Sequence, residues 1–130
     1  MMEHIVAPER AGNAAALRYS HGVRVNGLVL FSGVTGTQPD GSVSADPRTQ
    51  IEAAFNHLGL YLREAGLGFE HVVEITTYHV GLRRHLDSFL EVKDRFLREP
   101  YPAWTAIGVS ELITEGALVE IRAVAQAVVA

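Results

Sequence analysis

The end of the chain, residues 117–127, alternates regularly between two kinds of side chain, and this pattern most restricts the possible fold. Small and β-branched residues occupy every second position: Ala117, Val119, Ile121, Ala123, Ala125 and Ala127. A period of two predicts a strand whose apolar face packs on helices. The opposite face carries Glu120 and Arg122 among apolar neighbours. This pair indicates either an ion pair at the wet edge of a sheet or a functional site.

A β-hairpin is predicted in the first third of the chain. Asn26-Gly27 separates two runs rich in strand-forming residues, 19–25 and 28–32. This dipeptide is typical of a type I′ turn, because both central positions need a positive φ angle. Gly33 and Gly36 follow the hairpin, and we expect the backbone to bend there or to be approached closely by another group.

Strands are predicted in two further segments, and a third segment, at the beginning of the chain, has only a weak pattern. Residues 72–80 are rich in β-branched and aromatic side chains, which favours a central strand. Within residues 101–106, Pro102 is expected just before a strand, where its missing N–H costs no ladder hydrogen bond. Residues 1–16 are alanine-rich with weak periodicity, so we expect an irregular start or a short strand around residues 4–6.

Two segments have the periodicity of amphipathic helices. Asp46-Pro47 is typical of an N-cap followed by proline at the first helical position, and Gly66 predicts the end of that helix. A second helix is predicted over residues 86–97, ending before Pro100. Lys93 lies inside its apolar stripe. A lysine there usually extends its ammonium group to water, and the alternative is that the ammonium group lies at a pocket.

The order of these elements predicts one α+β domain spanning residues 1–130. We expect a mixed β-sheet of about six strands with two helices packed on one face. Two helices cover only one face of such a sheet. Because the other face also carries apolar residues, we expect it to contact another subunit.

Composition and motif spacing exclude several classes of site. The chain has no cysteine, so disulfides, thiolate zinc sites and cysteine nucleophiles are excluded. Its net charge of −4, without a basic run, makes nucleic acid an unfavourable partner. The histidines and carboxylates have no metal-ligand spacing, and no glycine-rich loop precedes a helix, so we expect no metal and no cofactor. No apolar run has the length of a membrane span, and we expect a cytoplasmic protein.

Three stretches taken together resemble the reactive-intermediate deaminase family, also called YjgF or Rid and labelled endoribonuclease L-PSP-like. The first runs from residues 19–23 (YSHGV) to Ser32-Gly33. The second is residues 89–96 (FLEVKDRF), and the third is Pro102-Ala103 followed by residues 119–123 (VEIRA). Their order and spacing, more than any single stretch, carry the resemblance, and it covers nearly the whole chain.

The resemblance implies a chorismate-mutase-like fold and a homotrimer with small-molecule sites between subunits. It also implies cofactor-independent hydrolysis of small enamines or imines to ketones and ammonia. By position, Glu120 matches the acid that positions or activates water, and Tyr19 matches a tyrosine of the ligand pocket. The backbone of Gly33 and Ala106 would line the ligand, with Ser32 beside them.

One position departs from the family pattern. Family deaminases have an arginine directly after Pro-Ala, where it binds the substrate carboxylate, and this chain has Trp104. A guanidinium offers two parallel charge-assisted hydrogen bonds, whereas an indole offers one neutral N–H. We therefore expect a larger or aromatic ligand in place of 2-iminopropanoate. Any positive charge that it needs would come from Lys93 or Arg122, and Lys93 is favoured slightly.

The sequence alone leaves three functions open. The first is a deaminase or hydrolase acting on a reactive enamine, imine or related intermediate, with Glu120 as the catalytic residue. The alternative is a non-catalytic trimer that binds small molecules or acts as a chaperone. A third and weaker hypothesis is an endoribonuclease or translation inhibitor, which the acidic balance of the chain disfavours.

Overall fold

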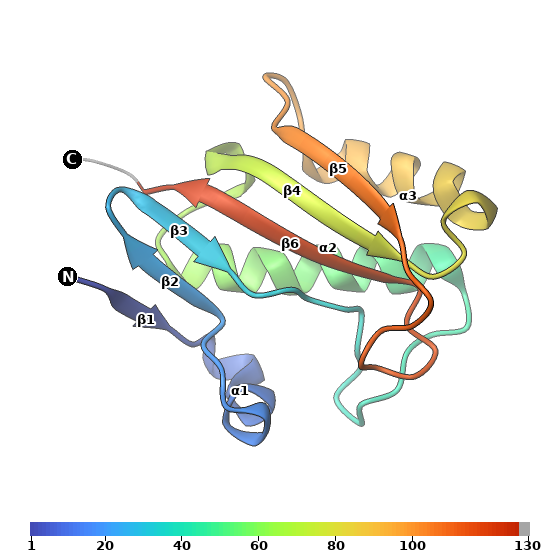
Figure 1. The fold of residues 1–130 in the computed structure, drawn as a ribbon, viewed down its shortest axis with the longest axis horizontal. Coiled ribbons are helices and arrows are strands. Elements are labelled where there is room, and N and C mark those ends of the chain that lie inside the picture. The colour runs from blue at the N-terminus through green and yellow to red at the C-terminus, as the bar shows by residue number, and fades with distance from the viewer. Residues whose placement is uncertain (128–130) are drawn as a thin grey trace.

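The computed structural model describes residues 1–127. Six strands form one sheet in the order β1-β2-β3-β6-β4-β5, and two long helices, α2 and α3, lie against one of its faces (Figure 1). The strands are β1 (Glu3–Ile5), β2 (Gly22–Val25), β3 (Leu28–Phe31), β4 (Val72–His79), β5 (Ala103–Gly108) and β6 (Val119–Gln126). The helices are α1 (Ala11–Leu17), α2 (Pro47–Glu64) and α3 (Leu82–Phe96), with 3₁₀ turns at Pro8–Arg10 and Phe69–His71.

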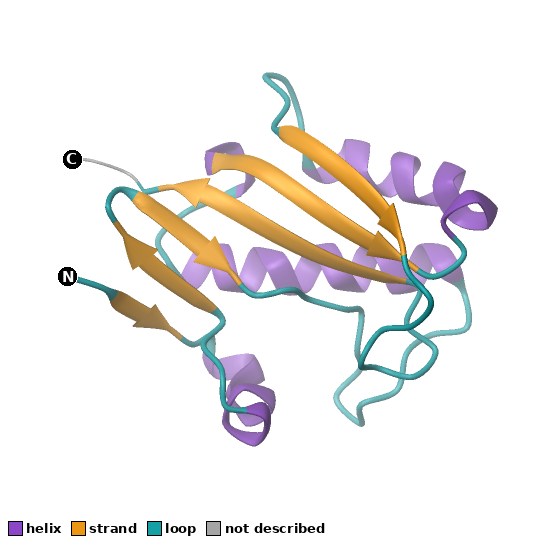
Figure 2. Cartoon of the chain, in the orientation of Figure 1, coloured by secondary structure: helices purple, strands orange, loops and turns teal. Residues whose placement is uncertain are grey.

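The sheet is mixed, because β4 and β5 run parallel and the other neighbouring strands run antiparallel. Helices and strands are drawn by type in Figure 2, where both long helices lie behind the sheet. The predicted α+β architecture, with two helices on one face, is therefore confirmed.

The predicted hairpin turn and the predicted ends of α2 are present in the structure. Asn26 and Gly27 have φ angles of 49° and 78° and join β2 to β3, as a type I′ turn requires. Asp46 caps α2 by accepting a hydrogen bond from the Thr49 backbone N–H at 3.0 Å. Gly66, with a φ angle of 75°, follows the end of that helix.

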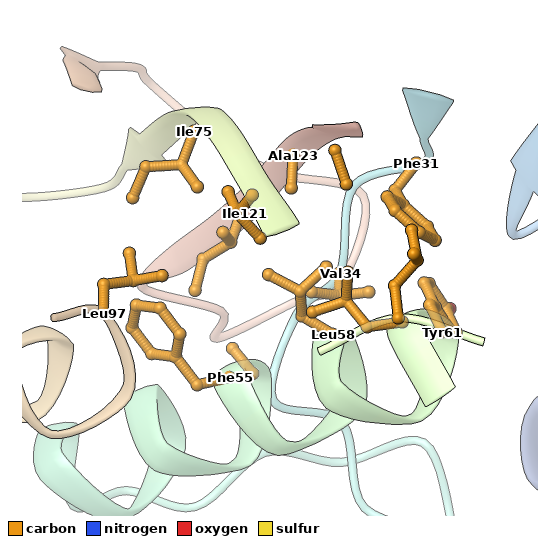
Figure 3. Close-up of a cluster of buried hydrophobic side chains, with 14 of the residues drawn as sticks. Phe31, Val34, Phe55, Leu58, Tyr61, Ile75, Leu97, Ile121 and Ala123 are labelled. Atoms are coloured by element: carbon orange, nitrogen blue, oxygen red, sulfur yellow. The ribbon is translucent and has the colours of Figure 1, made fainter. Parts of the chain in front are cut away.

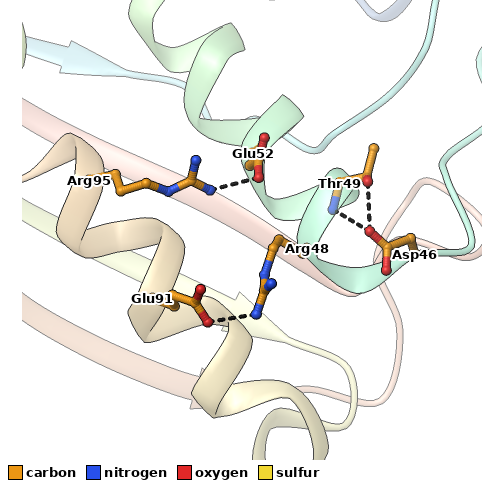
Figure 4. A network of polar contacts seen from close by, with 6 residues as sticks. All are labelled: Asp46, Arg48, Thr49, Glu52, Glu91 and Arg95. Atoms are coloured by element: carbon orange, nitrogen blue, oxygen red, sulfur yellow. Dashed lines mark hydrogen bonds and ion pairs between the residues drawn. The ribbon is translucent and has the colours of Figure 1, made fainter.

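Ion pairs on the surface join the two long helices (Figure 4). Arg48 of α2 pairs with Glu91 of α3, and Arg95 of α3 pairs with Glu52 of α2, each at 2.6 Å. All four side chains are substantially exposed. Exposed pairs contribute little individually, about 0–1 kcal/mol. The packing of the two helices therefore depends mainly on their apolar faces.

The hydrophobic core lies between the sheet and the two long helices (Figure 3). Ile121 of β6 and Phe55 and Leu58 of α2 are fully buried there. The alternation of β6 is confirmed, because every second residue is buried against the helices: Val119, Ile121, Ala123 and Ala125. Val124 is also buried, although it lies on the opposite face. The opposite face of the sheet, called the open face below, carries the intervening residues. By strand register these include Leu30, Thr76, Tyr78, Glu120 and Arg122.

The expectation of an irregular start was wrong in one respect. The short strand is present as β1, but residues 11–17 form α1 instead of irregular chain. Alanine is the strongest helix former, so the composition favours this outcome. Periodicity did not indicate the helix because only Ala14 of it is buried, which leaves no apolar stripe to detect. The helix ends at Arg18, which has a left-handed φ angle of 59°.

Within residues 1–127, no helix combines the length and the apolar character needed to cross a membrane.

Candidate functional site

One cavity of about 760 Å³ brings together segments that are distant in the sequence. Its walls come from residues 9–19, from the loop over residues 32–41 that follows β3, from residues 113–114, and from Glu120 at the beginning of β6. Small-molecule sites typically enclose about 300–1,000 Å³. Four of the eight residues predicted from the sequence line this cavity: Tyr19, Ser32, Gly33 and Glu120.

Gly33 and Glu120 are in close contact, as the sequence suggested for this glycine. Two backbone hydrogen bonds of 2.9 Å between Val34 and Ile121 bring the two segments together. A Cβ atom on residue 33 would lie 2.5 Å from Oε2 of Glu120 and 2.8 Å from its Cγ. Position 33 therefore has no room for a side chain while Glu120 keeps this conformation.

Glu120 is a half-buried carboxyl group without a counter-charge. Burial raises its pKa above the ordinary value of 4.5, and no neighbouring cation offsets this effect. The ion pair with Arg122 considered from the sequence does not form among residues 1–127. A half-buried carboxyl group whose pKa is raised in this way is better suited to accept a proton from a bound ligand or water than an exposed one.

Tyr19 presents a neutral phenol to the same cavity. Burial, with the neighbouring Tyr61, raises the pKa of Tyr19 to about 12. The negative charge of Glu120 acts in the same direction, and the positive charge of Arg10 opposes it. The Tyr19 hydroxyl group is therefore protonated at neutral pH and lies within the electrostatic range of both charges.

The Ser32 hydroxyl group is committed to the fold. It donates a hydrogen bond of 2.6 Å to the carbonyl oxygen of Ser20, and the Ser32 backbone N–H bonds the carbonyl oxygen of His21 at 2.9 Å. His21 is itself buried, and its Nδ1 accepts a hydrogen bond from the Ala7 backbone N–H. These bonds hold the end of β3 against the N-terminal segment, so Ser32 shapes the cavity wall.

Arg10 also lines the cavity, although it was not predicted from the sequence. Its guanidinium group bonds Tyr61, His57 and Thr37. These partners are 27 to 51 residues away in the chain. Arg10 stands in an alanine-rich segment of weak periodicity, so no local pattern marks it. Arg10 is recognised as a cavity residue only from its contacts with distant residues, and the sequence does not show these contacts.

Trp104 and Lys93 lie together outside the cavity, on the helix-covered side of the sheet. The Trp104 indole N–H donates to Oγ1 of Thr77 at 2.9 Å, and its ring stacks on Phe89 with a centroid separation of 5.8 Å. Nζ of Lys93 lies 4.9 Å from the centre of the indole ring. The Lys93 side chain is only 13% exposed, so it does not extend freely into water.

Ala106 and Arg122 also lie outside the cavity. Ala106 of β5 is in register with Thr77 of β4, two residues beyond Trp104 on the same side of the sheet. Arg122 is in register with Thr76 and lies on the open face. Within one subunit, therefore, the structure separates the predicted residues into two sets, and only the set around Glu120 shares a cavity.

Residues 1–127 contain no group of three or more histidine, aspartate or glutamate side chains placed to hold a metal ion. His79 and His85 do contact each other, with 3.3 Å between Nδ1 of His79 and Nε2 of His85. Nε2 of His79 lies 2.7 Å from Oγ1 of Thr77, which links the pair to Trp104. Burial lowers the pKa of His79 to about 4, so the His79 side chain in this series of hydrogen bonds is uncharged at neutral pH.

Comparison with known proteins assigns the fold and the family. The family model described as "Endoribonuclease L-PSP" matches residues 9–127. The chain belongs to this family, which includes the YjgF and Rid proteins. The "RutC family protein YjgH" of Escherichia coli strain K12 is 34% identical to this L-PSP family member over 96 residues, 73% of each chain.

Two further comparisons concern a solved structure and a relative whose name describes an activity. A solved structure of protein YJGH has a TM-score of 0.88 and 30% identity, covering 95% of both chains. This likeness confirms the chorismate-mutase-like fold. "Reactive Intermediate Deaminase A, chloroplastic" of Arabidopsis thaliana is 29% identical over 112 residues, 85% of this chain and 59% of that protein.

Proposed function

We propose that the protein hydrolyses a small enamine, imine or related reactive intermediate, with Glu120 positioning and activating water. Glu120 supports this proposal most directly, because it is a half-buried carboxyl group in a cavity and its pKa is raised by burial. The name of the Arabidopsis relative, a reactive intermediate deaminase, points to the same class of reaction.

The reaction needs one water molecule and no cofactor. Water adds to the carbon of the protonated C=N bond, and Glu120 takes a proton from it as the C–O bond forms, which leaves a neutral carbinolamine. Glu120 then returns this proton to the carbinolamine nitrogen and the C–N bond breaks. The departing ammonia takes up the hydroxyl proton, so the products are a ketone and ammonium. A positioned general acid–base group of this kind contributes about 10²–10⁴-fold in rate.

The neutral Tyr19 hydroxyl group would complement Glu120. A phenol with a pKa near 12 stays protonated while Glu120 titrates, so it can donate a hydrogen bond to the ligand throughout the reaction. The Ser32 hydroxyl group already donates to a carbonyl oxygen, which argues against its use as a nucleophile. Glu120 and Tyr19 are therefore the two groups of the cavity to which we assign chemistry.

We further propose that the protein works as a homotrimer with ligand sites between subunits. The open face supports association, because Leu28, Leu30 and Ile107 on it are each 37–40% exposed. In such an assembly, β5 and α3 of a neighbouring subunit would meet the cavity. That arrangement would give Lys93, Trp104 and Ala106 the ligand contacts expected of them, and Arg122 of β6 would lie on the associating open face.

The assay is ammonia release from freshly generated 2-aminoacrylate and from imines of bulkier 2-keto acids. Glu120→Gln should lower kcat/KM by at least about a hundredfold, the lower end expected for a general base. Glu74→Gln is the matched control, because Glu74 lies on the same sheet, is exposed and is outside the cavity. Equal rates for wild type and Glu120→Gln would remove Glu120 from the mechanism.

A binding protein without chemistry is the second candidate. Two observations support it. The Ser32 hydroxyl group is already used in a hydrogen bond to the Ser20 carbonyl oxygen, and Trp104 occupies the position where family deaminases have an arginine. This candidate predicts ligand binding without ammonia release. An endoribonuclease is a weaker candidate, because a chain of net charge −4 is poorly suited to a polyanion. RNA cleavage that a highly purified sample shows and Glu120→Gln abolishes would revive it.

A further inference from the structure

Arg10 is held firmly at the cavity wall by three neutral partners. Its Nε–H donates to the Tyr61 hydroxyl oxygen at 3.3 Å, and its second terminal nitrogen donates to Oγ1 of Thr37 at 3.1 Å. Its first terminal nitrogen contacts the ring of His57. Tyr61 is fully buried in α2, so one anchor of the guanidinium group belongs to the core.

The contacts of His57 determine how many Arg10 hydrogens remain. Nδ1 of His57 lies 2.9 Å from the carbonyl oxygen of Thr35, which can only accept, so Nδ1 carries the proton. The first terminal nitrogen of Arg10 lies 2.9 Å from Nδ1 and 3.2 Å from Nε2 of His57, and Nε2 is the ring nitrogen left to accept its hydrogen bond. A guanidinium group has five N–H donors, and three are used in this way. One N–H remains on each terminal nitrogen of Arg10, which is enough for a bidentate contact.

Among residues 1–127, the positive charge of Arg10 is not balanced by an ion pair. The adjacent Glu9 pairs with Arg63 instead. Glu120 does not pair with Arg10 either, because the ion pairs among the described residues include neither side chain. The described cavity wall therefore holds one cation without an ion pair, Arg10, and one carboxyl group without an ion pair, Glu120. Both charges influence the Tyr19 hydroxyl group.

We propose that Arg10 binds the carboxylate group of the ligand, so that the cavity accepts 2-imino or 2-enamino acids. This inference rests on the proposed function, and it assigns to Arg10 the positive charge that the sequence analysis sought in Lys93 or Arg122. A planar fork of two N–H donors matches a carboxylate better than a point charge does. Arg10 and Glu120 line the same cavity, so a ligand held by Arg10 occupies the space that Glu120 faces.

The apolar part of the wall specifies the rest of the ligand. Leu17 and Ile113 line the cavity and are 59% and 86% exposed. A ligand that covers these apolar side chains removes their surface from water, and this favours binding. The preferred ligand therefore has a branched or aromatic side chain, in keeping with a cavity of about 760 Å³ that is larger than 2-iminopropanoate requires.

The test uses a stable keto acid in place of the imine. Binding of 4-methyl-2-oxopentanoate, of its uncharged methyl ester and of inorganic phosphate is measured by titration calorimetry. Wild-type protein should bind the acid more tightly than the ester or phosphate. Arg10→Gln should weaken binding of the acid about tenfold to a hundredfold, the range for hydrogen bonds to charged groups, and leave the ester unchanged. Arg98→Gln is the control, since it removes an exposed arginine outside the cavity.

The comparison of acid with ester separates a binding role from a folding role. Misfolding of Arg10→Gln would weaken both ligands equally, and Arg10→Lys then provides the test because it keeps the charge without the fork. For Arg10→Lys we expect a partial loss for the acid alone. Equal affinity of wild type and both variants for the acid would overturn the proposal, as would equal affinity of wild type for acid and ester. Tighter binding of phosphate than of the acid would overturn the carboxylate assignment.

Failure of the proposed function would look different. Arg10-dependent binding of the keto acid, together with no ammonia release from its imine, supports the role of Arg10 and refutes the hydrolase. Ammonia release that Glu120→Gln abolishes and Arg10→Gln leaves unchanged supports the hydrolase and refutes the role of Arg10.

Discussion

Substitution of Gly33 by alanine should destabilise the protein only while Glu120 is present. A Cβ atom at this position would lie 2.5 Å from Oε2 and 2.8 Å from both Cδ and Cγ of Glu120. Rotation of the carboxyl group alone does not relieve this overlap, because Cγ is also too close. Overpacking of this kind costs about 1–3 kcal/mol.

The backbone of Gly33 accepts alanine, because it does not have a positive φ angle. Where the backbone permits, replacing glycine by alanine stabilises a protein by about 0.4–1 kcal/mol through the unfolded state. Gly33→Ala should therefore lower the free energy of unfolding in the wild type and raise it slightly in a Glu120→Ala background. The difference between the two effects, the coupling energy, should be about 1–3 kcal/mol.

Urea unfolding of the four proteins of this double-mutant cycle provides the measurement, at one fixed protein concentration because assembly would contribute to stability. Gly33→Ala should also reduce ammonia release as strongly as Glu120→Gln, because it displaces the carboxyl group. If Gly33→Ala has the same effect on unfolding in both backgrounds, the close contact between Gly33 and Glu120 does not exist and the geometry of the site is wrong.

Four further predictions follow from the site and its surroundings. Because burial raises the pKa of Glu120, kcat/KM should rise with pH through a midpoint above 4.5, and this limb should vanish in Glu120→Gln. His79 has its folded pKa depressed to about 4, so stability should fall as pH decreases from about 6.5 to 4, by at most about 1.4 kcal/mol per pH unit, and His79→Gln should flatten this dependence in urea titrations. Trp104→Phe removes the hydrogen bond to Thr77 and should cost about 1 kcal/mol in unfolding free energy, and Tyr101→Phe, an exposed aromatic, should cost nothing measurable. Light scattering coupled to size exclusion should give three times the subunit mass at micromolar concentration, and a monomer would contradict the trimer.

The elements that could be predicted from the sequence are those with a local signal. The alternation of residues 117–127 gave β6 and its buried face, and Asn26-Gly27 gave the hairpin, because period and turn chemistry act over a few residues. Glu120 could be singled out as a charge on an otherwise apolar strand. Its neighbour Gly33 was recognised as a point of close approach, although its partner was not.

The features that could not be predicted depend on pairing across the chain. The side of the sheet on which Trp104 lies follows from the parallel register of β5 on β4, which pairs Trp104 with the buried Ile75. A six-residue strand of small and apolar residues carries no pattern that reveals this. Arg10 was missed for the same reason, since its role arises from contacts with residues 27 to 51 positions away.

The cavity draws its walls from opposite ends of the chain, and this has a consequence for how a ligand would act on folding. Residues 9–19 connect β1 to β2 and Glu120 lies on β6, so they are brought together only when β1, β2, β3 and β6 have paired. A partly unfolded chain that has lost either end has no cavity. A bound ligand should therefore slow hydrogen exchange even at amides far from it, wherever exchange requires global unfolding. Occupancy of the cavity would then be detectable as protection of the Ile121 and Phe55 amides in the core.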